Sequence, residues 1–119
     1  MMRPYLLVAI GGALGASVRW GVGEWVSGSP GFPYATLLVN VVGCALIGLA
    51  ARLLLRGSDR WQFAVTGLLG GMTTYSSFAE ETRGLIDRGD LTQALLYVAA
   101  TIVVGLAATE FARGGGVRR

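Results

Sequence analysis

The residues with the clearest potential for chemistry lie in one stretch, residues 67–78, with the sequence Gly-Leu-Leu-Gly-Gly-Met-Thr-Thr-Tyr-Ser-Ser-Phe. Glycine loses much backbone entropy in a helix, and serine and threonine side chains compete for backbone hydrogen-bond partners. Because the stretch lies inside a long apolar segment, we expect the helix to break here. Freed carbonyls suit a hard cation such as Na⁺, and half-helix ends are common ion sites. The alternative, tight helix packing, explains the glycines but not the dense polar run.

Other polar and aromatic side chains also stand in apolar surroundings. Tyr75 and Phe78 are three residues apart and share a helical face, where the positive edges of their rings can contact an anion. Asn40 would be costly if it faced lipid, so it either joins helices or lines an ion pathway, and the sequence leaves both open. Arg19 is a candidate functional residue, with snorkelling to the membrane surface as the alternative.

A further feature is a series with four-residue spacing, made up of Tyr97, Thr101, Gly105 and Thr109. That spacing places two hydroxyls and a phenol along one helical face. Such a track can solvate a moving anion. Periodicity alone somewhat favours the other interpretation, which is hydrogen bonding to a neighbouring helix.

The composition places these residues in a membrane. Of 119 residues, 53% are hydrophobic and 14% are charged, and 19 are glycine, which suits closely packed helices in lipid. Four apolar stretches, at about residues 5–22, 34–55, 61–86 and 91–112, approach the roughly 20 residues that cross a bilayer. We therefore predict one all-α domain, residues 1–119, of four transmembrane helices with the third broken. Asp59 with Gln62, and Asp90 with Gln93, have capping-box spacing and predict two helix starts.

The basic residues set the expected orientation. All ten are arginines, and an even number of crossings puts both termini on the side of the loop near residues 55–60. Seven arginines fall on that side, two on the other, and Arg19 falls within the first span. Positive residues favour the cytoplasm, so both termini are predicted to be cytoplasmic. The scatter of the arginines between apolar runs argues against nucleic acid as a partner.

The composition also excludes several chemistries. With no histidine and one cysteine, Cys44, the chain cannot form a His/Cys metal cluster, an internal disulfide or a Cys–His nucleophile. No acid–base pair is visible, and we predict that the protein is not an enzyme. The main rival is a four-helix drug/proton antiporter, which needs a carboxylate within helix one, where Glu24 lies only at the end. A non-transporting assembly subunit is a second rival, and the broken helix argues against it.

Three segments together resemble the CrcB/Fluc fluoride channel family: residues 11–20, residues 36–43 and, above all, residues 67–78. Each motif alone is weak, but they occur in the family's order and spacing, and the four-helix layout covers essentially the whole chain. The resemblance implies a dual-topology antiparallel dimer with a pore on each side of its interface. It also implies passive export of fluoride across the cytoplasmic membrane, which lowers fluoride inside the cell.

The resemblance further implies roles for individual residues. A structural Na⁺ at the dimer interface would be bound by the backbone carbonyls of Gly70 and Thr73, and Arg19 would be a vestibule or structural residue. The implied fluoride pathway comprises Asn40, Tyr75, Ser76, Ser77, Phe78, Tyr97, Thr101 and Thr109.

This sequence departs from the family pattern at three positions. Tyr75 replaces the usual Phe, Ser77 replaces the usual Thr, and Gly105 lacks a hydroxyl that some members have. The phenol of Tyr75 adds a hydrogen-bond donor at the expected anion contact, and Gly105 weakens the polar track. The sequence therefore leaves the conduction competence of this subunit open.

The arginine distribution bears on the expected dimer. An antiparallel homodimer needs one chain to insert both ways, which requires nearly balanced positive charge. Seven arginines against two is unbalanced. Besides a homodimer, we therefore consider a heterodimer in which this chain pairs with an oppositely oriented relative. In either case the expected partners are fluoride, membrane lipid and a second subunit.

Overall fold

The structure is a computed structural model that describes residues 2–26 and 31–114. Those residues form helices and connecting turns, with no strand among them. The elements in chain order are α1 (Arg3–Val26), α2 (Tyr34–Leu53), α3 (Asp59–Trp61), η1 (Gln62–Leu69), α4 (Gly70–Met72), α5 (Tyr75–Asp87) and α6 (Leu91–Arg113). The segment from α3 to α4 is continuous, and its middle part, η1, is a π-helix.

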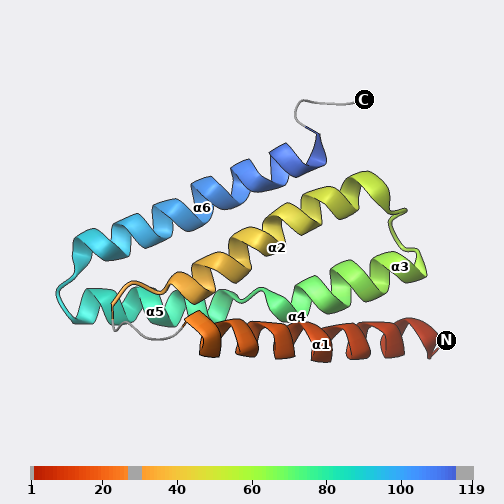
Figure 1. The fold of residues 1–119 in the computed structure, drawn as a ribbon, viewed down its shortest axis with the longest axis horizontal. Coiled ribbons are helices and arrows are strands. Elements are labelled where there is room, and N and C mark those ends of the chain that lie inside the picture. Colours follow the sequence, from red (N-terminus) through yellow and green to blue (C-terminus); the bar gives the residue numbers. More distant parts are fainter. Residues whose placement is uncertain (1, 27–30, 115–119) are drawn as a thin grey trace.

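The helices run roughly along one long direction (Figure 1). Helix α6 packs along α2, and α1 packs along η1 and α4. Helix α5 extends the line of the α3–α4 segment and contacts α6 (Figure 1). The chain therefore has two tightly packed pairs, which are joined through α2, since α2 also contacts α1, η1, α4 and α5.

Three helices, α1, α2 and α6, are long and apolar enough to cross a membrane. The third predicted span, residues 61–86, is not one long helix in the structure. Helix α4 ends at Met72, Thr73 and Thr74 have extended backbones, and α5 begins at Tyr75. The two helical parts of this segment, residues 59–72 and Tyr75–Asp87, are each too short to cross a bilayer alone.

Helices begin at both predicted places, but neither is capped as the sequence predicted. Ser58, rather than Asp59, is the N-cap of the third helical segment, and its side chain accepts a hydrogen bond from the Trp61 N–H. Serine is a favoured cap because its short hydroxyl reaches the free N–H groups of the first turn. Asp90 is the N-cap of α6 as expected, but its side chain makes no capping hydrogen bond.

Glycines bring α1 into direct backbone contact with the segment η1–α4. A Cβ added to Gly11 would lie 2.9 Å from the Leu68 nitrogen, and one added to Gly15 would lie 2.8 Å from the Met72 nitrogen. A Cβ on Gly71 would lie 2.9 Å from the Cα of Gly12. No side chain fits between the two backbones, which is the use of small residues in close helix packing.

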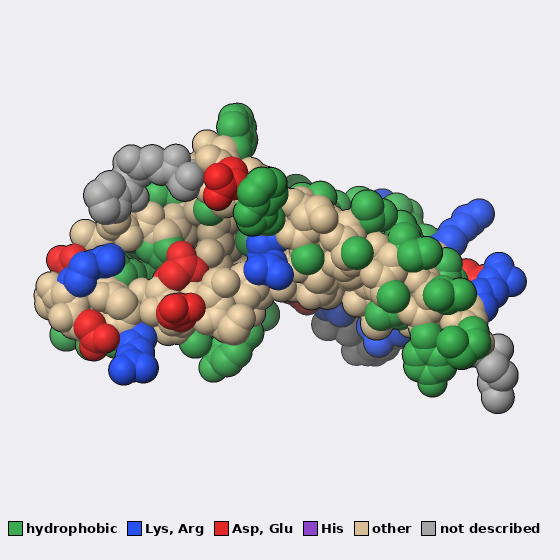
Figure 2. Space-filling view, turned by 90° about the horizontal axis from the view of Figure 1, so that it is seen from below, with side chains coloured by type: hydrophobic (Ala, Val, Ile, Leu, Met, Phe, Trp, Pro, Cys, Tyr) green, Lys and Arg blue, Asp and Glu red, His purple; other side chains and the backbone are tan. Residues whose placement is uncertain are grey.

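The surface is mostly apolar and the buried core is small. Only seven hydrophobic residues among those described are buried, whereas many large ones are exposed, including Leu14, Leu38 and Val103. Figure 2 shows hydrophobic side chains gathered mainly on the right half of the view, with charged side chains at both ends and a few near the middle. Such a surface is typical of a protein whose solvent is lipid.

Candidate functional site

The interruption between α4 and α5 is stabilised by the side chains of its own two residues. The Thr73 hydroxyl donates to the Leu69 carbonyl over 2.9 Å, which closes the end of the first half. The Thr74 hydroxyl accepts from the Ser77 N–H over 3.1 Å and caps the start of α5. Two adjacent threonines thus end one helical segment and begin the next, because short hydroxyl side chains can replace backbone partners.

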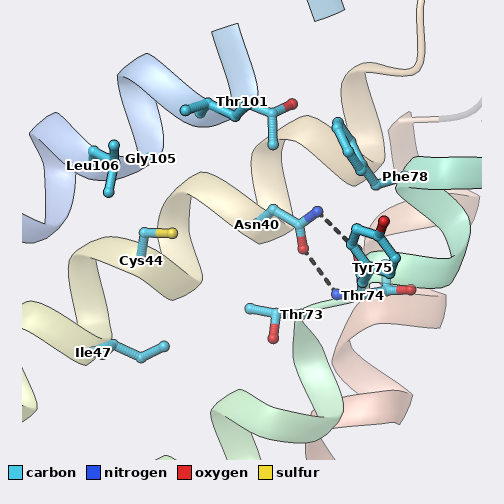
Figure 3. A pocket seen from close by; sticks show the side chains of 11 residues that line it. Asn40, Cys44, Ile47, Thr73, Thr74, Tyr75, Phe78, Thr101, Gly105 and Leu106 are labelled. Carbon is cyan, nitrogen blue, oxygen red and sulfur yellow. Dashed lines mark hydrogen bonds between the residues drawn. The ribbon is translucent and has the colours of Figure 1, made fainter. Parts of the chain in front are cut away.

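Asn40, on α2, holds the interruption from the neighbouring helix. Its Nδ2 donates to the Thr74 carbonyl over 3.0 Å, and its Oδ1 accepts from the Thr74 N–H over 2.9 Å (Figure 3). Both halves of the amide therefore bond one residue. The sequence left two roles open for Asn40, and this geometry places it as a link between helices that also borders a cavity between α2 and α6.

Arg19 reaches the same region from α1. Its Nε donates to the carbonyl of Gly71 over 3.2 Å, and the residue is half-buried. A cation that satisfies a carbonyl near a helix end is favourable, because the C-terminal end of a helix carries partial negative charge. Arg19 therefore contributes to the structure of the interruption.

The interruption releases the carbonyls of Gly70 and Thr73 from helical bonding. In a continuous α-helix, the Thr74 N–H would bond the Gly70 carbonyl and the Ser77 N–H would bond the Thr73 carbonyl. Here these two N–H groups bond Asn40 Oδ1 and Thr74 Oγ1 instead. Gly70 is also exposed. Two neutral oxygens, one of them on an open surface, fit a hard cation such as Na⁺.

The part of the chain that the structure describes offers no cluster of metal-binding side chains. Residues 2–26 and 31–114 contain no group of three or more His, Cys, Asp or Glu side chains placed to hold a metal ion. A cation bound here would therefore rely on backbone carbonyls, as the donor set at Gly70 and Thr73 provides.

A cavity of about 490 Å³ lies between α2, α6 and the interruption. It is open and mostly apolar, with a few polar groups at one end (Figure 3). Four of the residues predicted for the ion pathway border it together: Asn40, Tyr75, Phe78 and Thr101. The other lining residues are Cys44, Ile47, Thr73, Thr74, Ile102, Gly105 and Leu106.

The two threonine hydroxyls of the predicted α6 track, those of Thr101 and Thr109, are already bonded within the protein. Thr101 donates to the Tyr97 carbonyl over 2.7 Å, and Thr109 lies 3.0 Å from both the Gly105 and the Cys44 carbonyls. A hydroxyl has one hydrogen, so each presents only lone pairs in other directions. To receive an anion, such a hydroxyl must turn away from its carbonyl, at a cost of about 1 kcal/mol.

The aromatic side chains form a chain of ring contacts beside the cavity. The Tyr75 and Phe78 ring centroids are 6.1 Å apart, and those of Phe78 and Tyr97 are 5.2 Å apart. Tyr75 is 80% exposed, whereas Tyr97 is fully buried. The chain of rings therefore runs from the open surface into the core.

The two predicted serines take separate positions. Ser77 borders a smaller cavity of about 230 Å³ together with Arg19, Glu24, Thr36 and Thr74. Ser76 is exposed, and its hydroxyl lies 3.2 Å from that of Thr74. Of the residues predicted for the pathway, four therefore border the larger of these two cavities and Ser77 borders the smaller one, whereas Ser76, Tyr97 and Thr109 border neither.

A family model described as "CrcB-like protein, Camphor Resistance (CrcB)" matches residues 6–113 of this chain. The chain belongs to the CrcB-like family. The match extends from the first turn of α1 to the last residue of α6, so it includes every element described above.

Relatives in this family share much of the sequence. A protein of Thermus thermophilus is 49% identical over 107 residues, which cover 86% of this chain and 84% of that protein. One of Paracoccus denitrificans is 46% identical, covering 91% and 90%, and one of Bordetella petrii is 49% identical, covering 88% and 84%. All three are described as "Fluoride-specific ion channel FluC".

This CrcB-like chain also contains a polar contact beside the aromatic rings that the sequence did not predict. Thr36 donates its hydroxyl hydrogen to a Glu81 carboxylate oxygen over 2.6 Å, which joins α2 to α5. The buried Tyr97 hydroxyl has no hydrogen-bond partner among the described residues. Spacing offered a signal, because Thr36 lies four residues before Asn40, and Glu81 lies three after Phe78.

Proposed function

We propose that this chain is a subunit of a fluoride-specific ion channel that lets F⁻ leave the cell passively across the cytoplasmic membrane. The observation that carries the proposal is membership of the CrcB-like family together with relatives described as fluoride-specific channels. The cavity beside the interrupted segment supports it. The protein is a channel and not an enzyme, because fluoride passes through it chemically unchanged.

The driving force needs no fuel. Fluoride is the anion of a weak acid, so neutral HF crosses the membrane and releases F⁻ inside when the outside is acidic. The inside-negative potential then drives the anion outward with about 2.3 kcal/mol per charge for each 100 mV. A passive pore is therefore sufficient for export.

The pathway must replace the hydration of a small anion in steps. The side chains available are the exposed Tyr75 ring and phenol, the Phe78 ring edge and the Thr101 hydroxyl, all on the cavity between α2, α6 and the interruption. Ser76 and Ser77 lie at the start of α5, and Tyr97 and Thr109 continue the series along α6. Ring edges and hydroxyls bind an anion weakly and in succession, as fast conduction requires.

The segment from α3 to α5 supplies the fourth crossing in this proposal. At about 1.5 Å per residue, α3 to α4 and α5 are each roughly 20 Å long, and together they exceed the ~30 Å hydrocarbon core. Non-helical backbone at membrane depth is tolerated where protein covers it. Asn40 and Arg19 provide that cover at Thr74 and Gly71. Four crossings with most arginines at one end support an orientation with both termini in the cytoplasm.

The carbonyls of Gly70 and Thr73 would hold a structural Na⁺ between two antiparallel copies. One chain offers two oxygens, which is too few for a hard cation, and a second copy would double that number. The exposure of Gly70 supports this arrangement. Seven arginines against two favour a partner of opposite orientation over a second copy of this chain. In either kind of dimer, each subunit would contribute its two carbonyls.

The test is anion efflux from liposomes that contain the purified chain, alone or with an oppositely oriented relative. We expect rapid F⁻ efflux and little Cl⁻ efflux in at least one preparation. Phe78→Ala should slow F⁻ efflux, whereas Val103→Ala, on an exposed position of α6, serves as the control. F⁻ efflux no faster than from empty liposomes in both preparations would refute the proposal.

A further inference from the structure

Asn40 makes the same pair of hydrogen bonds that a neighbouring strand would make to an extended residue. Its amide donates to the Thr74 carbonyl and accepts from the Thr74 N–H, at 3.0 and 2.9 Å. The partner atoms fix which side of the amide is oxygen, because a carbonyl accepts and an N–H donates. Thr74 has the extended backbone that this pairing needs, with φ −147° and ψ 125°.

This pairing determines which acceptor the Thr74 N–H bonds. Without Asn40, the acceptor that a helix would offer it is the Gly70 carbonyl, four residues earlier. A buried N–H in lipid surroundings must find a partner, so losing the amide favours continuation of α4 across Thr73 and Thr74. The Gly70 carbonyl would then accept a helical hydrogen bond and would no longer be free for a cation.

Helix α2 also fixes the neighbouring residue by contact. Gly43 lies one turn beyond Asn40, and an added Cβ there would clash with the Thr73 Cγ2 and lie 3.5 Å from the Met72 Cε. The α2 backbone therefore packs directly on Thr73 while the Asn40 amide holds Thr74. Together these contacts set the position of the interruption relative to α2.

We propose that Asn40 is a positioning residue for the cation site. By holding both polar atoms of the Thr74 backbone, it keeps the Gly70 carbonyl, and with it the Thr73 carbonyl, available for Na⁺. This inference rests on the proposed function, because it takes the Na⁺ site at these carbonyls as given. It assigns Asn40 a task distinct from contact with the anion.

The proposal predicts that Asn40 variants change the response to Na⁺. Thermal unfolding of the detergent-solubilised full chain would be followed while NaCl replaces N-methylglucamine chloride at constant ionic strength. A residue that orients metal ligands typically contributes 10–100-fold to affinity, so Asn40→Leu should raise the half-maximal Na⁺ concentration on the order of tenfold or more. Asn40→Ser, whose hydroxyl is too short to replace the amide, should act in the same direction if the leucine variant does not fold.

Asn40→Asp separates the positioning task from conduction. A carboxylate still accepts from the Thr74 N–H, which keeps the Gly70 carbonyl free, but its second oxygen faces the Thr74 carbonyl without a hydrogen to donate, so the Na⁺ midpoint should rise less than in Asn40→Leu. Its negative charge at the cavity should nevertheless abolish F⁻ efflux. Thr101→Val is the matched control, because Thr101 borders the same cavity but donates only within α6. It should leave the Na⁺ midpoint unchanged.

Each outcome of this titration is decisive. A wild-type Na⁺ midpoint in both Asn40→Leu and Asn40→Ser would overturn the positioning role while leaving the channel function intact. A wild type that does not respond to Na⁺ at all would overturn the cation site and this inference together. Fluoride efflux is measured separately, so loss of the proposed transport function would be recognised on its own.

Discussion

Replacing Gly71 with alanine should separate α1 from the first half of the interrupted segment. The added Cβ would lie 2.9 Å from the Gly12 Cα and 3.0 Å from its carbonyl carbon, whereas ordinary contact begins at 3.4 Å. These neighbours are backbone atoms of another helix, so no side chain can rotate away. One of the two helices must move.

The magnitude follows from the kind of atom that is displaced. Overpacking of an interior typically costs 1–3 kcal/mol, and a rigid backbone neighbour places Gly71→Ala at about 3 kcal/mol or more. Gly12→Ala is the matched control at the same contact. Its Cβ would lie 3.8 Å from the Gly67 carbonyl oxygen, which is ordinary contact, and alanine gains about 1 kcal/mol of helix propensity. Gly12→Ala should therefore be neutral or slightly stabilising.

The assay is thermal unfolding of both variants in detergent, paired with F⁻ efflux from liposomes. A loss of about 3 kcal/mol corresponds to a fall in Tm of roughly 10 °C for a chain of this size. Efflux by Gly71→Ala should fall as well, because the displaced segment carries the carbonyls of Gly70 and Thr73. Equal Tm values for Gly71→Ala and Gly12→Ala would show that the two backbones are not in contact, and would refute the packing argument.

Three other substitutions test separate contacts. Tyr75→Phe should leave Tm unchanged, since the side chain is 80% exposed. It should raise the F⁻ concentration at which efflux is half-saturated about tenfold or more, because it removes a hydrogen-bond donor to the anion. An unchanged half-saturating concentration would show that the phenol is not part of the pathway. Thr36→Val should lower stability by about 1–3 kcal/mol because it leaves the half-buried Glu81 carboxylate without its 2.6 Å partner, and an unfolding curve matching the wild type would count against that contact. Thr74→Ala should cost about 0.5–2 kcal/mol through loss of the α5 cap, with Thr74→Ser restoring it, and failure of the serine to restore stability would mean that the cap is unimportant.

The sequence predicted what depends on local composition. Residues 67–78 combine glycines with hydroxyl side chains, and the non-helical residues of the structure, Thr73 and Thr74, lie within them. The abundance of glycine predicted closely packed helices, and Gly11 and Gly15 do lie against η1 and α4. These features follow from single residues or short periods, which a sequence displays directly.

Contacts between residues far apart in the chain could not be predicted from the sequence. The asparagine at position 40 was recognised as significant, but its partner Thr74 lies 34 residues away, and nothing local names it. The Thr36–Glu81 contact likewise spans 45 residues. The π-helical form of η1 was missed because a π-helix and an α-helix differ by one residue in hydrogen-bond register, which apolar composition does not reveal.

The sequence separation of these contacts has a consequence for synthesis of the protein. Asn40 and Arg19 enter the bilayer 34 and 52 residues before the backbone groups that they bond. At about 5–20 residues per second, each waits roughly 2–10 s for its partner to leave the ribosome. Until then, an amide and a guanidinium in nascent helices need water, lipid head groups or the insertion machinery as substitutes. The polar groups that stabilise the interruption in the folded protein therefore also oppose stable insertion of the incomplete chain into the hydrocarbon core.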